Sequence, residues 1–227
     1  MSLVSFITVT NRPEFSEAVL AQFNAQDLDE KELIVVEAET EDSYLKYRCD
    51  DYVSVPPETM VGAMRNLGFE RAHGDWIFWL DDDDWRHPAL VRWLVDCAVR
   101  ADAPMASMHE CFWIDLNGQM AFYDCMEWPI FAASIYRNDP PMPTFRPKVC
   151  RKSDSYWLLR ILHDKKWDPS VTGPHPTRYV VVSHGRNVHN PEMRGRIVAD
   201  TELDPRFLRD SPLGLHAHME RLRRAVS

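Results

Sequence analysis

The sequence has no excess of basic residues and no long hydrophobic run. Among its 227 residues, 26 Lys and Arg stand against 35 Asp and Glu, which gives a formal net charge of −9. A negative chain repels nucleic-acid phosphates, so a general nucleic-acid binder is disfavoured. The apolar stretch at residues 76–80 is far shorter than the roughly 20 residues that a membrane helix needs, so we expect no transmembrane segment.

The sequence also lacks a cysteine pattern and a secretion signal. Its five cysteines are an odd number without a CxxC pair, which fits neither a disulfide framework nor a thiolate zinc site. Residues 1–5 contain no Lys or Arg ahead of an apolar segment. We therefore expect a cytoplasmic protein. The hydrophobic fraction of 45% is enough for a sizeable core.

The first hundred residues alternate between apolar, β-branched runs and segments with apolar residues at helical spacing. The pattern predicts strands at residues 3–10, 33–36, 51–55 and 75–80, and helices at residues 14–24, 60–72 and 88–100. Thr59 and Gly74 are the expected caps of the second helix. Strands that alternate with helices favour an α/β fold, with an open, mostly parallel sheet and helices on both faces.

The rest of the chain is less regular. We expect strands at residues 105–115, 119–123 and 179–183, and helices at residues 153–165 and 213–226. No internal repeat or low-complexity linker divides the chain. We therefore predict one domain, 1–227, with a nucleotide-binding half at residues 1–103 and an acceptor-binding half at residues 104–227.

Four consecutive aspartates, Asp81 to Asp84, follow the apolar strand at residues 75–80. Carboxylates held this close repel one another and raise each other's pKa unless a cation lies among them. Oxygen ligands suit hard divalent ions such as Mg²⁺ or Mn²⁺, which share a few carboxylates with substrate phosphates. In open α/β sheets, ligands bind at the carboxyl ends of the strands, where this run is placed. The alternative is a solvated acidic loop.

The segment from Val61 to Trp85, VGAMRNLGFERAHGDWIFWLDDDDW, resembles the family 2 glycosyltransferases of GT-A fold. The strand that ends in Thr10-Asn11-Arg12-Pro13 resembles the opening of that family, and the two segments cover about the first hundred residues. The resemblance implies a Rossmann-like open mixed sheet. It also implies transfer of a hexose or pentose from a nucleotide-diphosphate donor, with Mn²⁺ or Mg²⁺ on the diphosphate.

By this resemblance, Asp81-x-Asp83 is the DxD motif of the family, with Asp81 and Asp82 near the ribose and Asp83 as the metal ligand. The ion would act as a Lewis acid that stabilises charge on the leaving diphosphate. Arg65, on the helix before the motif, resembles the basic residue that faces the nucleotide in related enzymes. The alternative for Arg65 is an exposed helix arginine.

The expected nucleobase pocket departs from the family pattern. Thr10 and Arg12 stand where the family places this pocket, and the alternative is that both are ordinary loop residues. The second strand reaches Glu37 where the family commonly has two aspartates and a Gly-Ser turn. An ionised Glu37 only accepts hydrogen bonds, which suits the imide of uracil. A UDP-sugar is the donor that we expect.

In the second half, residues 151–160 resemble the Glu-Asp segment of the family, with serine in place of the glutamate. Asp154 is therefore the candidate base, which would take a proton from an acceptor hydroxyl in an inverting displacement. The alternative is an aspartate that complements a helix dipole. Tyr156 and Trp157 beside it either stack on a sugar or fill the core.

Several GT-A enzymes complete the metal site with a histidine late in the chain. By that resemblance, His184 coordinates the ion and Arg186 pairs with the diphosphate. A lone histidine would otherwise be structural. The position of His184 directly after the strand at residues 179–183 favours the metal role.

Two other classes stay open on the sequence alone. A Mg²⁺-dependent nucleotidyltransferase would normally have a glycine-rich phosphate loop, but residues 10–13 contain no glycine. A degenerate domain that binds a nucleotide or carbohydrate without turnover is the non-enzyme alternative. As acceptor we expect a glycan or small-molecule hydroxyl, since the net charge of −9 disfavours a modified DNA base.

Overall fold

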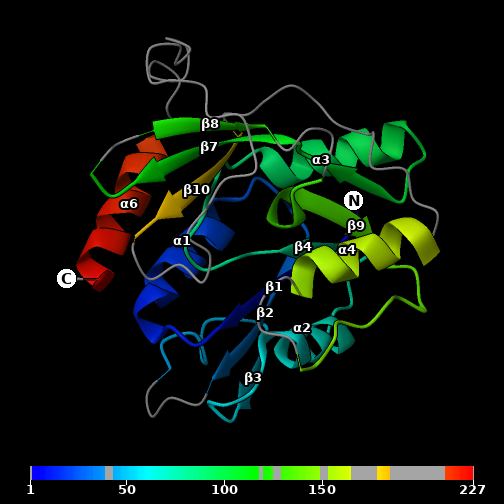
Figure 1. Ribbon diagram of the computed structural model, residues 1–227, viewed down its shortest axis with the longest axis horizontal. Helices are drawn as coiled ribbons and strands as arrows, with labels where there is room; N and C mark the ends of the chain where they lie inside the picture. The colour runs from blue at the N-terminus through cyan, green and yellow to red at the C-terminus, as the bar shows by residue number, and fades with distance from the viewer. Residues whose placement is uncertain are drawn as a thin grey trace.

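A six-stranded mixed sheet lies at the centre of the structure (Figure 1). Its order is β3-β2-β1-β4-β9-β6; β1 to β4 pair in parallel, and β9 runs antiparallel to β4 and β6. The strands are β1 (Val4–Thr10), β2 (Lys31–Ala38), β3 (Asp51–Val55), β4 (Trp76–Trp79), β6 (Met105–Ser107) and β9 (Ser134–Arg137). This computed structural model describes residues 2–38, 43–117, 120–124, 129–148, 153–164, 178–184 and 213–226. The predicted α/β sheet is confirmed.

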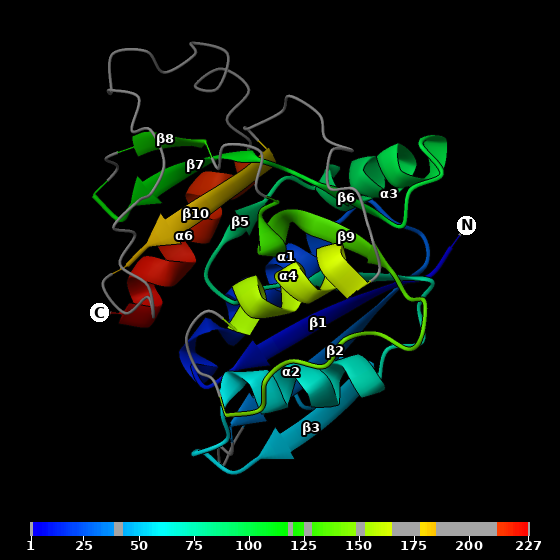
Figure 2. The same cartoon turned by 45° about the vertical axis from the view of Figure 1, so that its right-hand side comes forward.

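Helices cover both faces of this sheet, as the sequence predicts. The helices are α1 (Ser16–Ala25), α2 (Val61–Glu70), α3 (Leu90–Arg100) and α4 (Ser153–Asp164). Phe6 and Ile7 point to opposite faces because side chains alternate along a strand. Phe6 packs edge-on against Phe23 of α1, with ring centroids 5.4 Å apart, whereas Ile7 faces Gly68 of α2. Figure 2 shows α2 and α4 in front of the sheet and α1 behind it.

A second, four-stranded sheet has the order β5-β10-β7-β8 and packs against the C-terminal helix. Its elements are β5 (Trp85–Arg86), β7 (Glu110–Asp115), β8 (Met120–Asp124), β10 (Tyr179–Ser183) and α6 (Leu213–Val226). Trp85, Val180 and Leu222 share one buried cluster. Since β5 begins directly after Asp84, the aspartate run joins the two sheets. Among the described residues, no helix combines the length and apolarity needed to cross a membrane.

The second half of the chain differs from the prediction. The expected strand at residues 105–115 is two strands, because β6 belongs to the large sheet and β7 to the small one. Between them, the N–H of Met108 donates to the carbonyl of Ala133, before β9. Strands β5 and β9 were not predicted, because two and four residues are too few to show alternation. Two 3-10 turns, η1 (Pro13–Phe15) and η2 (Phe131–Ala133), complete the described structure.

Both predicted caps of the second helix are wrong. The N-cap of α2 is Met60 rather than Thr59, and the helix ends at Glu70 with Arg71 as its C-cap. Gly74 lies beyond the helix, against β1. A Cβ at this position would lie 2.6 Å from the backbone nitrogen of Ser5, so close packing is the reason that glycine is needed.

We expect Gly74→Ala to lower the free energy of unfolding by about 1–3 kcal/mol, because the new methyl group meets backbone atoms that cannot move aside. Urea denaturation measures this loss. Gly214→Ala is the matched control, since among the described residues its Cβ would meet only Trp85, at 3.4 Å, and the position is exposed on α6. Equal stability of the two variants would contradict the packing argument.

Candidate active site between strands β1, β4 and β10

The aspartate run leaves β4 and crosses the carboxyl end of the large sheet before it enters β5. Only Asp81 is partly open to solvent, with about a third (34%) of its side chain exposed. Asp82, Asp83 and Asp84 are all buried. The alternative of a solvated acidic loop is therefore wrong. Buried carboxylates need partners, and each of the three has them.

Two residues that were not predicted as site residues form hydrogen bonds to the backbone of the aspartate run. Arg86 is fully buried, and its Nη1 donates to the carbonyl oxygens of Asp81 at 3.2 Å and Asp84 at 3.1 Å. His218 of α6 is also buried, with Nε2 2.9 Å from the carbonyl oxygen of Asp83. A carbonyl only accepts, so Nε2 carries the hydrogen. Burial lowers the pKa of His218 to about 4, and the ring is neutral at pH 7.

The carboxylates of Asp82 and Asp83 meet residues from β1 and β10. The Thr10 hydroxyl donates to Asp82 Oδ2 at 2.5 Å, and Arg12 binds both oxygens of Asp82. Arg12 Nη2 also lies 2.9 Å from Asp83 Oδ2. His184, directly after β10, lies 3.1 Å from the same oxygen through Nε2. These five predicted site residues therefore come together, and Thr10 and Arg12 are not ordinary loop residues.

Charges within this group shift its pKa values in opposite directions. Burial and the charge of Asp83 raise the pKa of Asp82 to about 6, although Arg12 offsets part of the shift. Burial also opposes ionisation of Asp83, but the hydrogen bond from His184 and the charge of Arg12 outweigh it and lower that pKa. Asp83 is thus the ionised carboxylate at the centre of the group.

Asp84 has a separate, structural position. Its carboxyl group accepts the backbone N–H of Val182 at 3.2 Å and contacts the hydroxyl of Tyr179, both on β10. Burial and the charge of Asp83 raise the pKa of Asp84 to about 8. At neutral pH this group is therefore mostly protonated, and it ties the run to the small sheet.

Arg65 of α2 is buried beside Asp81, so the alternative of an exposed helix arginine is wrong. Its guanidinium lies 3.9 Å from the Asp81 carboxylate and 4.7 Å from the ring centroid of Phe131. The ring centroids of Phe145 and Trp79 lie 5.5 and 5.9 Å from it. The guanidinium thus lies between the partly exposed aspartate and a group of aromatic rings, which attract a cation.

Asp154 lies in the first turn of α4, half-buried. Burial is the main cause of the raised pKa of Asp81, and the charge of Asp154 contributes to it, which places the two carboxylates in one electrostatic environment. Trp157 fills the core, and its indole N–H donates to the Pro143 carbonyl at 2.6 Å. Tyr156 is exposed under the guanidinium of Arg146, so the two aromatic residues do not share a role.

Glu37 pairs in register with Thr10 on the neighbouring strand and is fully buried. The hydroxyl of Tyr52 donates to its Oε2 at 2.8 Å, and Ser43 donates to the same oxygen. Among the described residues, Oε1 of Glu37 has no hydrogen-bond partner. Its contact with a nucleobase stays a prediction, and Arg186 lies outside the described residues.

The donor set fits a divalent cation that is bound jointly with a diphosphate. Within the described ranges, no three His, Cys, Asp or Glu residues are arranged as a complete metal site. Asp83 and His184 would supply two ligands, since they lie 3.1 Å apart, and Mg²⁺-type ions commonly take the rest from phosphates and water.

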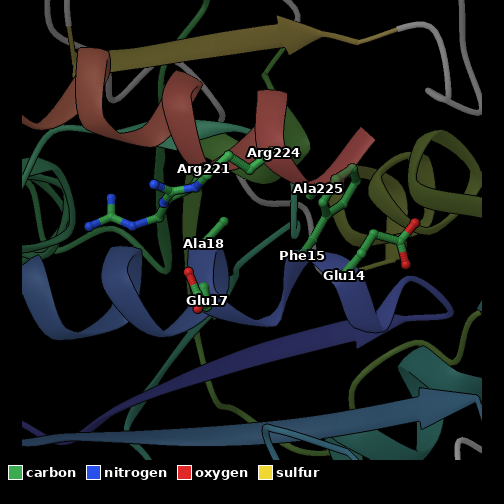
Figure 3. A pocket seen from close by; sticks show the side chains of 7 residues that line it. All are labelled: Glu14, Phe15, Glu17, Ala18, Arg221, Arg224 and Ala225. Atoms are coloured by element: carbon green, nitrogen blue, oxygen red, sulfur yellow. The ribbon is translucent and has the colours of Figure 1, made fainter. Parts of the chain in front are cut away.

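A pocket of about 220 Å³ lies between α6 and the segment formed by η1 and the start of α1 (Figure 3). Side chains of both signs face it, and the lining residues are Glu14, Phe15, Glu17, Ala18, Arg221, Arg224 and Ala225. Phe15 links the pocket to the site, because its ring lies 4.9 Å from that of His184. None of the four aspartates lines the pocket.

Comparison with solved structures finds a similar fold in proteins that were crystallised with uridine nucleotides. TarS 1–349 from S. aureus, solved with UDP-GlcNAc, is 15% identical, with a TM-score of 0.58 over 82% of this chain and 60% of that chain. Glucosyl-3-phosphoglycerate synthase from Mycobacterium tuberculosis, solved with Mg²⁺ and UDP, is 15% identical, with a TM-score of 0.52 over 81% of this chain and 69% of that chain. The chain spans only 57% of TarS 1–349 solved alone. The predicted GT-A-type fold is confirmed.

Sequence comparison identifies the family of this chain more directly. No curated protein matches the chain. The sequence profile described as "Glycosyl transferase family 2" matches residues 5–120, just over half of the chain. This match includes nearly all of β1, strands β2 to β4 and the whole aspartate run. The chain belongs to glycosyl transferase family 2.

Proposed function

We propose that this protein transfers a hexose or pentose from a nucleotide-diphosphate donor, a UDP-sugar first, to a hydroxyl acceptor. One observation carries the proposal: Arg12, Arg65 and His184 gather around Asp81 and Asp83 at the carboxyl end of the sheet. Ligands of open α/β sheets bind at that edge. Cations next to acidic metal ligands suit a diphosphate that arrives with a divalent ion.

The donor site is built mainly from residues 1–103. Asp83 and His184 would hold Mn²⁺ or Mg²⁺, which as a Lewis acid supplies stabilisation of the leaving diphosphate. We assign Asp81 and Asp82 to the ribose side, with Arg65 facing the nucleotide. The assignment of Asp82 requires its bonds to Thr10 and Arg12 to open.

Recognition of the nucleobase and diphosphate involves three further assignments. Oε1 of Glu37, which has no partner among the described residues, supports a role as acceptor for the uracil imide, beside Thr10 in register. Arg186 is assigned to the diphosphate on the resemblance alone. The solved complexes of TarS with UDP-GlcNAc and of the mycobacterial synthase with UDP and Mg²⁺ support a uridine donor.

The acceptor site is assigned to residues 104–227 of one continuous domain. Asp154 takes the proton from the acceptor hydroxyl as that oxygen attacks the anomeric carbon, which inverts its configuration. The shared electrostatic environment of Asp154 and Asp81 supports this placement. A glycan or small-molecule hydroxyl is the acceptor class, because the net charge of −9 disfavours a modified DNA base.

Release of nucleoside diphosphate from a panel of sugar nucleotides tests the proposed function. We expect slow hydrolysis of a UDP-sugar with Mn²⁺ or Mg²⁺, faster turnover once an acceptor is added, and loss of both in EDTA. Binding of nucleotide without turnover of any donor would instead indicate a binding module. Turnover that is equal in EDTA would contradict the metal assignment.

We expect Asp154→Asn to lower kcat by at least about 100-fold, because the amide cannot take the acceptor proton. Steady-state kinetics with acceptor measures this loss, and UDP affinity should not change. Asp96→Asn, on the exposed face of α3, is the matched control. A variant of Asp154 with normal kcat would assign this residue to the helix dipole alone.

A further inference from the structure

Arg12 occupies the place in which a metal ion would have to bind. Its Nη2 lies 2.9 Å from Asp83 Oδ2, and its Nη1 lies 3.4 Å from His184 Nε2. The same guanidinium binds both oxygens of Asp82. The two proposed metal ligands are thus both in contact with a cation that belongs to the protein.

A metal ion and this guanidinium compete for one atom. Asp83 Oδ2 is the oxygen that both Arg12 and His184 contact, and these side chains are shielded from water. Two cations on one oxygen repel strongly in such an environment. Arg12 also neutralises part of the negative charge that would otherwise draw a metal ion to Asp82 and Asp83. The acidic group therefore attracts a second cation only weakly while Arg12 stays there.

A nucleotide diphosphate removes this obstacle, because it offers Arg12 another anion. Guanidinium groups bind phosphate oxygens through two parallel hydrogen bonds, as they bind carboxylates. Arg12 is more accessible than Asp83 or His184, with 20% of its side chain exposed. Its guanidinium lies 4.8 Å from the ring centroid of Phe15. It can turn outward and keep its own charge paired, because the diphosphate replaces the carboxylates as its partner.

We propose that Arg12 couples metal binding to donor binding. In the free protein its guanidinium closes the acidic site, and the donor diphosphate draws it away from Asp83 and frees that oxygen for the ion. This inference rests on the proposed function. By linkage, nucleotide and metal must then raise each other's affinity by the same factor, and coupling of this kind typically amounts to about 5- to 150-fold.

Titration of the protein with Mn²⁺ alone, followed by the EPR signal of free Mn²⁺, tests the coupling without an activity assay. We expect Arg12→Gln to bind Mn²⁺ about tenfold more tightly than the unaltered protein when no nucleotide is present. Calorimetric titration with UDP in EDTA should show the opposite change. Arg12→Gln should bind UDP more weakly than the unaltered protein, because the diphosphate loses the guanidinium as a partner. Arg12→Lys keeps the charge but not the paired hydrogen bonds, and should lie between the two.

Arg71→Gln is the control for a simple change in net charge, since Arg71 is exposed and pairs with Asp51 on β3. It should bind Mn²⁺ and UDP normally. Thermal unfolding verifies that each variant is folded. If Arg12→Gln does not fold, the test uses Arg12→Lys instead. Mn²⁺ affinity that is unchanged or weaker in the folded Arg12 variants would overturn the inference.

Two outcomes separate this inference from the proposed function. Metal-independent turnover of a UDP-sugar, with no Mn²⁺ bound by any variant, overturns the coupling and leaves glycosyl transfer in place. The expected shifts in Mn²⁺ and UDP affinity without turnover of any sugar nucleotide support the coupling and contradict the proposed function.

Discussion

Arg86→Met is expected to lower the free energy of unfolding by about 3–5 kcal/mol, because it removes a buried cation and leaves its partners without donors. Arg86 is fully buried on β5 and donates to the carbonyl oxygens of Asp81, Asp84 and Ala132. Methionine fills a similar volume but donates nothing. The carbonyls would stay buried and unsatisfied, which is the costly situation for a polar group.

The same change should abolish donor turnover. Arg86 holds the backbone of the aspartate run through hydrogen bonds to the carbonyls of Asp81 and Asp84. Without them, we expect the carboxylates of Asp81 and Asp83 to move out of position for binding the donor. Urea denaturation and UDP release measure the two effects. Arg86→Lys keeps the charge with fewer hydrogen bonds and should be intermediate in both. A methionine variant within 1 kcal/mol of the unaltered protein would show that the carbonyls find other donors.

Asp83→Asn is expected to lower turnover by at least about 100-fold, because the change removes the ionised oxygen that would bind the metal. The amide still has one oxygen for Arg12 or His184, so the fold should survive. UDP release with Mn²⁺ measures the loss, and Mn²⁺ titration in the presence of UDP should show weaker binding.

Asp84→Asn is a sharp control for this prediction, because it changes the next residue of the same run. Asp84 is mostly protonated and bound to β10, and asparagine can keep an acceptor for Val182 and a donor toward Tyr179. This variant should keep most of the activity. Equal losses in the two variants would mean that the acidic run acts as a unit and that Asp83 has no special role.

The front half of the fold could be predicted because its signals are local. Residues 3–10 are mostly apolar or β-branched and residues 76–80 are apolar, which is typical of buried parallel strands, and the helices between them show their own spacing. The later strands could not be predicted in the same way. Strand β9 has four residues and depends on pairing with β4 and β6, which lie far away in the sequence.

The site shows the same division between local and long-range information. The acidic run, Arg12 and Arg65 were predicted from short motifs, and the structure gathers them at one edge. Arg86 and His218 were missed because their roles arise from hydrogen bonds to backbone carbonyls, and no residue pattern encodes such a bond across 135 positions, as between His218 and Asp83. The capping role expected of Gly74 failed for a similar reason, since its constraint comes from β1.

The structure also separates four adjacent aspartates that look alike in the sequence. Asp81 faces Arg65 and solvent, whereas Asp82 faces Thr10 and Arg12. Asp83 is the ionised partner of His184, and Asp84 binds β10. Burial, charge and direction therefore differ at each position, although residue type does not.

An anomalous difference map from a crystal grown with Mn²⁺ and UDP is the most direct test of the donor site. We predict one Mn²⁺ peak within coordination distance of Asp83 Oδ2 and His184 Nε2, with the UDP diphosphate on the same ion and Arg12 turned toward a phosphate. UDP bound elsewhere, or a diphosphate at this edge with no Mn²⁺ between it and Asp83, would contradict the proposed site.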